Sequence, residues 1–310
     1  MFAALPIAIL SESEDVMKQY ICIDIGGTSI KYGLISREGE FLDTGERPTE
    51  AFMGGPAVLG KAVEIAQNYL SKGNAAGICV STAGMVDCEK GEIIHAAPLI
   101  PGYTGTQIKK TMEETFYIPC EVENDVNCAG LAETFAGAAR GTSSSLCLTI
   151  GTGIGGAIIL NGQVLHGISN SACEVGYMSM DGSTFQELGA SSILVKKVAA
   201  RKGLSLEEVN GKRVFDMAKQ GDPDCIQAID EMADVLGKGI ANICYVINPE
   251  MVVLGGGIMA QREYLYDRIK EALHRYLIPA VASKTKLAFA ENQNQAGMLG
   301  AFYHFCAKHK

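Results

Sequence analysis

One arrangement occurs twice along the chain: a β-rich run, a glycine-rich turn and a second β-rich run. The first copy spans residues 19–36 and the second spans residues 144–160. β-Branched residues are typical of strands, and glycine is typical of the turns between them. Because a unit that recurs in both halves indicates internal duplication, we expect two α/β domains. Each should hold a mixed five-stranded sheet flanked by helices.

The segments that follow each copy carry apolar residues at helical spacing. This pattern predicts helices over residues 56–72, 104–117, 126–138, 190–202, 207–219, 223–247, 262–276 and 295–308. Shorter apolar runs predict further strands within residues 75–87, 119–125 and 251–258. We expect an N-terminal extension at residues 1–17, a small domain formed by residues 18–120 with 295–310, and a large domain at residues 121–294.

The charge of the chain argues against nucleic acid as a partner. The formal net charge is −9 and no run of Lys or Arg exceeds two residues, so a basic footprint for phosphates is missing. The apolar start, residues 1–10, has no positively charged segment before it and is too short to span a bilayer. We therefore expect a cytoplasmic protein without a nucleic-acid or membrane partner.

The ten cysteines do not follow the spacing of a metal site or of a small disulfide scaffold. The closest neighbours in sequence are Cys120 and Cys128, and no two cysteines are two or three positions apart. Most lie in apolar runs, where a free cysteine behaves as a small hydrophobic residue. The pattern predicts reduced cysteines in the core.

Glycines cluster at the ends of three predicted strands. Without a Cβ atom the backbone can approach a polyphosphate and turn its N–H groups toward the oxygens. A single glycine pair is usually only a tight turn, but three such clusters favour a nucleotide. The predicted ATP-binding residues are Asp24, Gly26, Gly27, Thr28, Lys31, Thr152, Gly153, Gly155, Gly256 and Gly257. Asp24, at the end of its strand, should hold Mg²⁺ through water or phosphate.

The second cluster is neither a Walker loop nor a dinucleotide-binding motif. A Walker loop requires Gly-Lys followed by Ser or Thr, which this segment lacks. Residues 151–156 contain Gly-x-Gly-x-x-Gly, but they continue as a strand at residues 157–160 instead of opening a helix. The sequence therefore argues against a dinucleotide site of the Rossmann type.

Six short motifs follow one another along the chain: DIGGT (24–28), ENDVN (123–127), LTIGTGIGGA (148–157), EVGY (174–177), LGGGI (254–258) and QAGMLGA (295–301). Their order resembles that of the ROK family of sugar kinases and repressors over residues 18–308. The resemblance implies the actin-like ATPase (ribonuclease H-like) fold, with two duplicated α/β domains and a central cleft for ATP and sugar. It also implies ATP and Mg²⁺ as cofactors.

Asp125 stands where a predicted strand gives way to a helix. From the residues alone, a helix N-cap and a general base fit this position equally well. The resemblance to ROK kinases implies that Asp125 is the base that deprotonates the accepting sugar hydroxyl. It implies a contact between Asn124 and a sugar hydroxyl.

The motif around Glu174 matches the family pattern Glu-x-Gly-His except at its last position. The resemblance assigns Glu174 to the sugar hydroxyls, and a buried carboxylate would suit that role because it accepts two hydrogen bonds. Tyr177 replaces the family's histidine, which in most relatives also ligates a structural zinc. The following residues, 178–192, contain no cysteine, so we expect no zinc site. Glu187 is a further candidate for sugar binding.

Two upstream loops match segments that line the sugar cleft in relatives. Gly84 lies in the first loop and Tyr103 in the second, where an aromatic ring could stack on a pyranose. Leu99 stands where many glucokinases have a polar residue. The resemblance therefore implies substrate contacts at Gly84 and Tyr103, in a more apolar pocket.

These departures from the common pattern resemble the β-glucoside kinases of the family. The expected reaction is ATP-dependent phosphorylation of the 6-hydroxyl of a glucosyl unit, as in cellobiose or gentiobiose. The alternatives are a zinc-free glucokinase or a kinase for another hexose or N-acetylhexosamine. A sugar-responsive regulator is a remote alternative, since too few residues precede Asp24 for a DNA-binding domain. Related kinases commonly form homodimers, which the sequence neither shows nor excludes.

Overall fold

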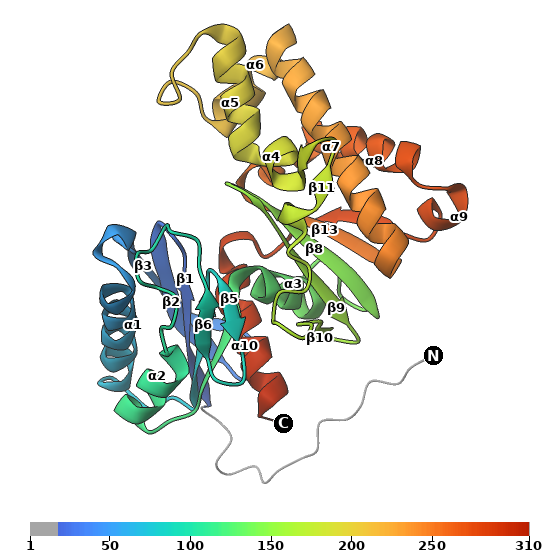
Figure 1. The fold of residues 1–310 in the computed structure, drawn as a ribbon. Coiled ribbons are helices and arrows are strands. Elements are labelled where there is room, and N and C mark those ends of the chain that lie inside the picture. The colour runs from blue at the N-terminus through green and yellow to red at the C-terminus, as the bar shows by residue number, and fades with distance from the viewer. Residues whose placement is uncertain (1–17, 310) are drawn as a thin grey trace. The chain divides into compact units, whose positions relative to one another are not determined.

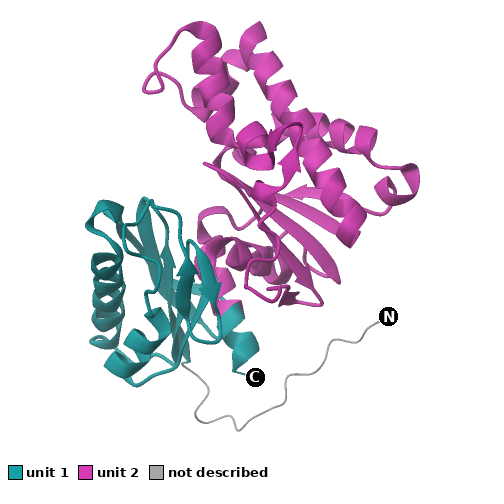
Figure 2. Cartoon of the chain, viewed as in Figure 1, with its two compact units in different colours: residues 1–123, 304–310 teal, residues 124–303 magenta. Residues whose placement is uncertain are grey.

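The computed structural model describes residues 18–309, which form mixed sheets and helices (Figure 1). The extension predicted at residues 1–17 lies outside the described residues. Contacts within the described chain divide it into two compact units (Figure 2). Unit 1 holds residues 18–123 and 304–309, and unit 2 holds residues 124–303. Domain boundaries at 120/121 and 294/295 stay a prediction.

Unit 1 is built on a five-stranded sheet with the order β3-β2-β1-β4-β7. The strands are β1 (Gln19–Ile25), β2 (Ser29–Ser36), β3 (Phe41–Pro48), β4 (Gly77–Thr82) and β7 (Cys120–Asn124). The first three form an antiparallel meander, and β4 runs parallel to β1. The remaining elements are η1 (Ala51–Met53), α1 (Gly55–Leu70), β5 (Met85–Asp87), β6 (Glu92–His95) and α2 (Ile108–Phe116).

Alternate residues of β1 hold the first glycine turn to the core of unit 1. Ile21, Ile23 and Ile25 are fully buried and share one apolar cluster with Val58 and Ile65 of α1. Full burial of such a side chain contributes about 1.5–3 kcal/mol. The end of β1, where the turn begins, is therefore fixed by packing.

Unit 2 repeats the plan with a sheet of order β10-β9-β8-β13-β14. Its strands are β8 (Ser144–Ile150), β9 (Ile154–Leu160), β10 (Gln163–Val164), β13 (Met251–Gly255) and β14 (Lys286–Phe289), with a separate pair β11 (Ser179–Met180) and β12 (Ser183–Thr184). The α-helices are α3 (Asp125–Ala136), α4 (Phe185–Gly189), α5 (Ser191–Lys202), α6 (Gly211–Lys219), α7 (Pro223–Ile247), α8 (Arg262–Tyr276), α9 (Pro279–Ala282) and α10 (Ala296–Lys308). From His304 onward, α10 belongs to unit 1. Three 3₁₀ turns complete unit 2: η2 (Val175–Tyr177), η3 (Gly257–Gln261) and η4 (Gln293–Gln295).

The predicted pair of mixed five-stranded sheets and all the predicted helices are confirmed. Two helices begin later than periodicity indicated. Gly102 and Gly105 have positive φ angles, so the chain is still turning before α2 begins. Asn210 accepts a hydrogen bond from the N–H of Arg213 and thereby sets the start of α6.

The cysteines behave as the sequence predicted. They form no disulfide within the described residues, and only Cys173 and Cys306 are more than marginally exposed. Burial raises the pKa of the Cys225 thiol to about 11, with a smaller contribution from the neighbouring Asp222 carboxylate. None of the helices in residues 18–309 combines the length and hydropathy of a membrane span.

A buried carboxylate joins α3 to the segment that precedes α10. Glu133 is 1% exposed. It accepts hydrogen bonds from the backbone N–H groups of Ala138 (2.8 Å), Glu291 (3.0 Å) and Asn292 (2.8 Å), and from the side-chain amide of Asn292 (3.0 Å). A buried carboxylate is stable only with such donors, so this contact fixes both segments of unit 2.

We expect Glu133→Ala to lower the free energy of unfolding by about 3 kcal/mol, because several donors lose their acceptor at once. Urea denaturation followed by circular dichroism measures the change. Glu114→Ala, on the exposed face of α2, is the matched control and should change stability by less than about 0.5 kcal/mol. Equal effects of the two substitutions would contradict the assignment.

Candidate functional site

Asp24 lies at the end of β1, between a lysine and a serine on the neighbouring strands. It faces Lys31 of β2 and Ser81 of β4 in the sheet register, and the Ser81 hydroxyl donates to its Oδ1 at 2.7 Å. Burial raises the pKa of Asp24, although the hydrogen bond from Ser81 and the charge of Lys31 act in the opposite direction. A divalent cation would stabilise the ionised carboxylate there, so Asp24 fits the predicted Mg²⁺ role.

The first glycine turn is held from outside by one threonine. The Thr49 hydroxyl donates to the Gly26 carbonyl at 2.6 Å, and the Thr49 N–H donates to the Thr28 carbonyl at 2.9 Å. A Cβ atom on Gly27 would lie 2.4 Å from Cδ2 of Leu99. The loop predicted to line the sugar pocket therefore packs directly on the first glycine turn.

Tyr103 is placed differently from what stacking on a sugar requires. Its side chain is 1% exposed, and its hydroxyl lies 2.7 Å from Oγ1 of Thr82 at the end of β4. The ring therefore offers no exposed face, and the geometry makes Tyr103 a support for the β4 end. Gly84 follows with φ near +100°, and a Cβ atom there would lie 2.8 Å from the His95 carbonyl. This turn requires glycine.

Asn124 is the N-cap of α3, and Asp125 is its first residue. The Asn124 side chain accepts hydrogen bonds from the N–H groups of Val126 (2.9 Å) and Asn127 (3.1 Å), and its amide donates to Oδ1 of Asp125 at 3.0 Å. The capping role that the sequence left open for Asp125 is thus filled mainly by Asn124. A carboxylate in the first turn is also favoured by the helix dipole.

The start of α3 packs against the second glycine cluster. A Cβ atom on Gly155 would lie 2.7 Å from Cγ2 of Val126. On the other side of the cluster, the Ser191 hydroxyl donates to the Gly151 carbonyl and the Ser192 hydroxyl donates to the Thr152 carbonyl, each at 2.7 Å. The start of α3, which carries Asp125, and the second glycine turn are therefore in contact within unit 2.

The third glycine turn packs against the end of β8, the strand that leads into the second glycine turn. A Cβ atom on Gly256 would lie 2.2 Å from the carbonyl oxygen of Ile150. Next to this turn is a pocket of about 340 Å³, lined by Ser191, Asn210, Gly211, Lys212, Gly257 and Ile258 among others. Because Ser191 also binds Gly151, this pocket adjoins the second cluster, and its volume suits a small organic group.

Another pocket, of about 320 Å³, lies beside the third turn and includes Arg262 and Phe289. Ser191 does not line it. Of these two pockets, the one lined by Ser191 is therefore the pocket that adjoins the second glycine cluster.

Glu174 is the residue before the turn η2 and Tyr177 is its last residue; both are exposed, Tyr177 to 62%. Glu174 is thus not the buried carboxylate expected. Glu187 is occupied locally, since its carboxylate accepts from the hydroxyls of Ser183 (2.9 Å) and Thr184 (3.0 Å). These two hydrogen bonds lower the pKa of Glu187. They turn its carboxylate toward the start of α4.

Gln186 is a residue that the sequence prediction missed. Its Oε1 lies 2.7 Å from the position of a Cβ on Gly153 and 2.8 Å from that of a Cβ on Gly176. It therefore lies between the second glycine cluster and η2. The sequence Thr184-x-x-Glu187 matches a capping box, which assigns the Glu187 side chain to the start of the helix. That signal could have indicated that the neighbouring Gln186, and not Glu187, faces the glycine cluster.

The predicted site residues fall into two sets. Unit 1 holds Asp24, Gly26, Gly27, Thr28, Lys31, Gly84 and Tyr103, and unit 2 holds Asn124, Asp125, Thr152, Gly153, Gly155, Glu174, Tyr177, Glu187, Gly256 and Gly257. The absence of zinc stays a prediction.

Comparisons with known proteins show the family and the fold of the chain. The model of the ROK family matches residues 20–308. An uncharacterized protein of Clostridium perfringens is 52% identical, over 93% of this chain and 98% of its own, and a β-glucoside kinase of Klebsiella pneumoniae is 31% identical, over 91% and 94%. A ROK family glucokinase from Streptomyces griseus, solved with glucose and AMPPNP, aligns with TM-score 0.79 and 25% identity over 91% of this chain and 97% of its own. The predicted actin-like fold is thereby confirmed.

Two neighbouring glycines give a test of the third turn. Gly256 has φ near +105° and is packed against Ile150, whereas a Cβ on Gly257 would meet no protein atom within 4 Å. We expect Gly256→Ala to lower the free energy of unfolding by about 2 kcal/mol or more through backbone strain. Gly257→Ala should change it by less than about 0.5 kcal/mol. Thermal unfolding without ligand measures both, and a reversed order would contradict the described turn.

Proposed function

Because the chain belongs to the ROK family, we propose that it is an ATP-dependent kinase for the 6-hydroxyl of a glucosyl unit, most specifically of a β-glucoside. The observation that carries this proposal is the start of α3. Asn124 takes the capping role, which leaves Asp125 one residue from the contact between Val126 and Gly155. A carboxylate next to a phosphate-binding turn is suited to act as a base for phosphoryl transfer.

The nucleotide is proposed to bind along the second and third glycine turns. Its nucleoside would occupy the pocket of about 340 Å³, and its phosphates would follow Thr152 and Gly153. The open space beside Gly257 supports this placement. In unit 1, Asp24 would hold Mg²⁺, which supplies positive charge for phosphoryl transfer.

Asp125 would act on the sugar hydroxyl during the transfer. The hydroxyl oxygen forms a bond to the γ-phosphorus, the bond between that phosphorus and the β–γ bridging oxygen breaks, and ADP leaves. The hydroxyl proton passes to the Asp125 carboxylate. The rest of the acceleration comes from positioning and from donors that stabilise the phosphoryl oxygens.

The β-glucoside assignment is supported by η2 and by the relatives. Tyr177 stands in the family's histidine position with most of its ring exposed, so it can stack on a sugar unit. Gln186 presents an amide close to the same turn, where a carboxylate such as Glu187 was expected. The kinase of Klebsiella pneumoniae named for β-glucosides shares 31% of residues. A zinc-free kinase for glucose, another hexose or an N-acetylhexosamine is the alternative, favoured by the likeness to the Streptomyces griseus glucokinase.

A sugar panel tests the substrate. With ATP and Mg²⁺, release of ADP should be fastest in kcat/KM with cellobiose or gentiobiose, and slower with glucose, fructose and N-acetylmannosamine. A much higher kcat/KM for glucose would move the assignment to glucokinase. No ADP release with any sugar would count against the kinase and favour a regulator.

Replacement of the proposed base tests the mechanism. Asp125→Asn should lower kcat by about 10²–10⁴-fold and leave ATP affinity largely intact, because the amide cannot accept the proton. Steady-state ADP release gives kcat, and calorimetric titration gives the ATP affinity. Asp216→Asn, exposed on α6, is the control and should keep the wild-type rate. An Asp125→Asn rate close to wild type would move the base elsewhere.

A further inference from the structure

The chain passes between its two units at two places, and the unit 1 residues at these places contact each other. The first passage follows Glu123 at the end of β7, and the second precedes His304 in α10. Nδ1 of His304 lies 3.4 Å from Oε2 of Glu123, with side-chain exposures of 7% and 1%. A buried carboxylate that loses its partner is strongly destabilised, so this pair ties the two passages together.

A thiol faces the same carboxylate. Burial, and then the charge of and hydrogen bond to Glu123, raise the pKa of the Cys88 thiol well above its usual range. The thiol therefore stays neutral, and its Sγ donates to the carbonyl oxygen of Val86 at 3.7 Å.

Within unit 2, the helices of the two passages are already joined. A Cβ atom on Gly300 of α10 would lie 1.8 Å from the carbonyl oxygen of Cys128 in α3, so the two backbones are in close contact. Further along α3, Glu133 binds the N–H groups of Glu291 and Asn292. The two helices are thus fixed to each other on the unit 2 side.

On the unit 1 side, the end of β7 leads straight into the proposed base. Glu123 is followed by Asn124, the N-cap of α3, and then by Asp125. A shift at Glu123 therefore displaces the start of α3. Displacing a catalytic group by about 1 Å can cost up to about 100-fold in rate.

From these contacts we propose that His304 is a positioning residue for the phosphoryl transfer. Acting through Glu123, it fixes the direction in which β7 passes into Asn124 and Asp125. This inference rests on the proposed role of Asp125 as the base. In this role, the His304 imidazole holds the buried carboxylate of Glu123, which stands two residues before the proposed base Asp125.

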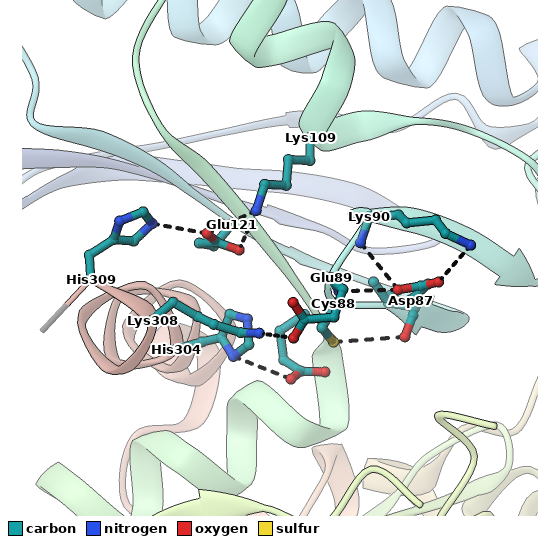
Figure 3. Close-up of polar contacts among 11 residues, drawn as sticks. Asp87, Cys88, Glu89, Lys90, Lys109, Glu121, His304, Lys308 and His309 are labelled. Carbon is teal, nitrogen blue, oxygen red and sulfur yellow. Dashed lines mark hydrogen bonds and ion pairs between the residues drawn. The ribbon is translucent and has the colours of Figure 1, made fainter. Parts of the chain in front are cut away.

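The residue that follows α10, together with a second glutamate of β7, offers a matched control. His309 lies 2.9 Å from the Glu121 carboxylate, also on β7, but its side chain is 38% exposed. Glu121 keeps a second partner, because Lys109 donates to both of its oxygens at 2.9 and 3.0 Å (Figure 3). Loss of His309 should therefore leave β7 in place.

The experiment compares His304→Leu, His304→Asn and His309→Gln by ADP release with the best sugar, next to thermal unfolding. We expect His304→Leu to lower kcat by about 10–100-fold, with the KM for ATP within about twofold of wild type. His304→Asn, whose side-chain amide can donate to the Glu123 carboxylate, should recover much of the loss. His309→Gln should match wild type.

Glu123→Gln keeps the size of the side chain and serves if His304→Leu does not fold. It should slow kcat similarly, and the double variant Glu123→Gln/His304→Asn should be no slower than the slower single variant. A folded His304→Leu protein with the wild-type kcat, or a His304→Asn protein as slow as His304→Leu, would overturn the inference. Inactivity of the wild type with every sugar would instead sink the proposed function.

Discussion

The cap of α3 is the interaction on which the candidate site depends. The first N–H groups of a helix have no partner inside the helix, and Asn124 supplies the acceptor for two of them. This bond sets the residue at which the strand β7 becomes a helix. It places Asp125 in the first turn and Val126 against Gly155. Without this cap, the Asp125 carboxylate and the contact between Val126 and Gly155 would lose their support at the start of α3.

The duplicated sheets explain why the two halves of the site differ. Both sheets follow the same plan, but unit 2 inserts helices α4 to α7 before β13, where unit 1 has only α1 before β4. The insertion supplies Ser191, Asn210 and Lys212, which line the pocket beside the third glycine turn. The second and third glycine turns, both in unit 2, therefore have a pocket beside them that the inserted segment helps to form.

Local patterns predicted the elements well and the exposure of single side chains poorly. Periodicity predicted the helices, and glycines at strand ends predicted the three turns, since both signals lie in neighbouring residues. The burial of Tyr103 depends on packing against distant Thr82, which no local pattern shows. Glu187 and Gln186 differ by one position, and only the fold decides which faces Gly153. A capping box was the one local signal available there.

The thiols in the interior of each unit are unreactive because they are buried. Cys22 and Cys79 lie opposite each other on β1 and β4, and Cys225 and Cys244 lie in α7. Thiolates are the reactive species, and burial keeps these groups out of contact with reagents in water. Alkylation would then follow the opening of the core, and the modified cysteine would identify which unit had opened first.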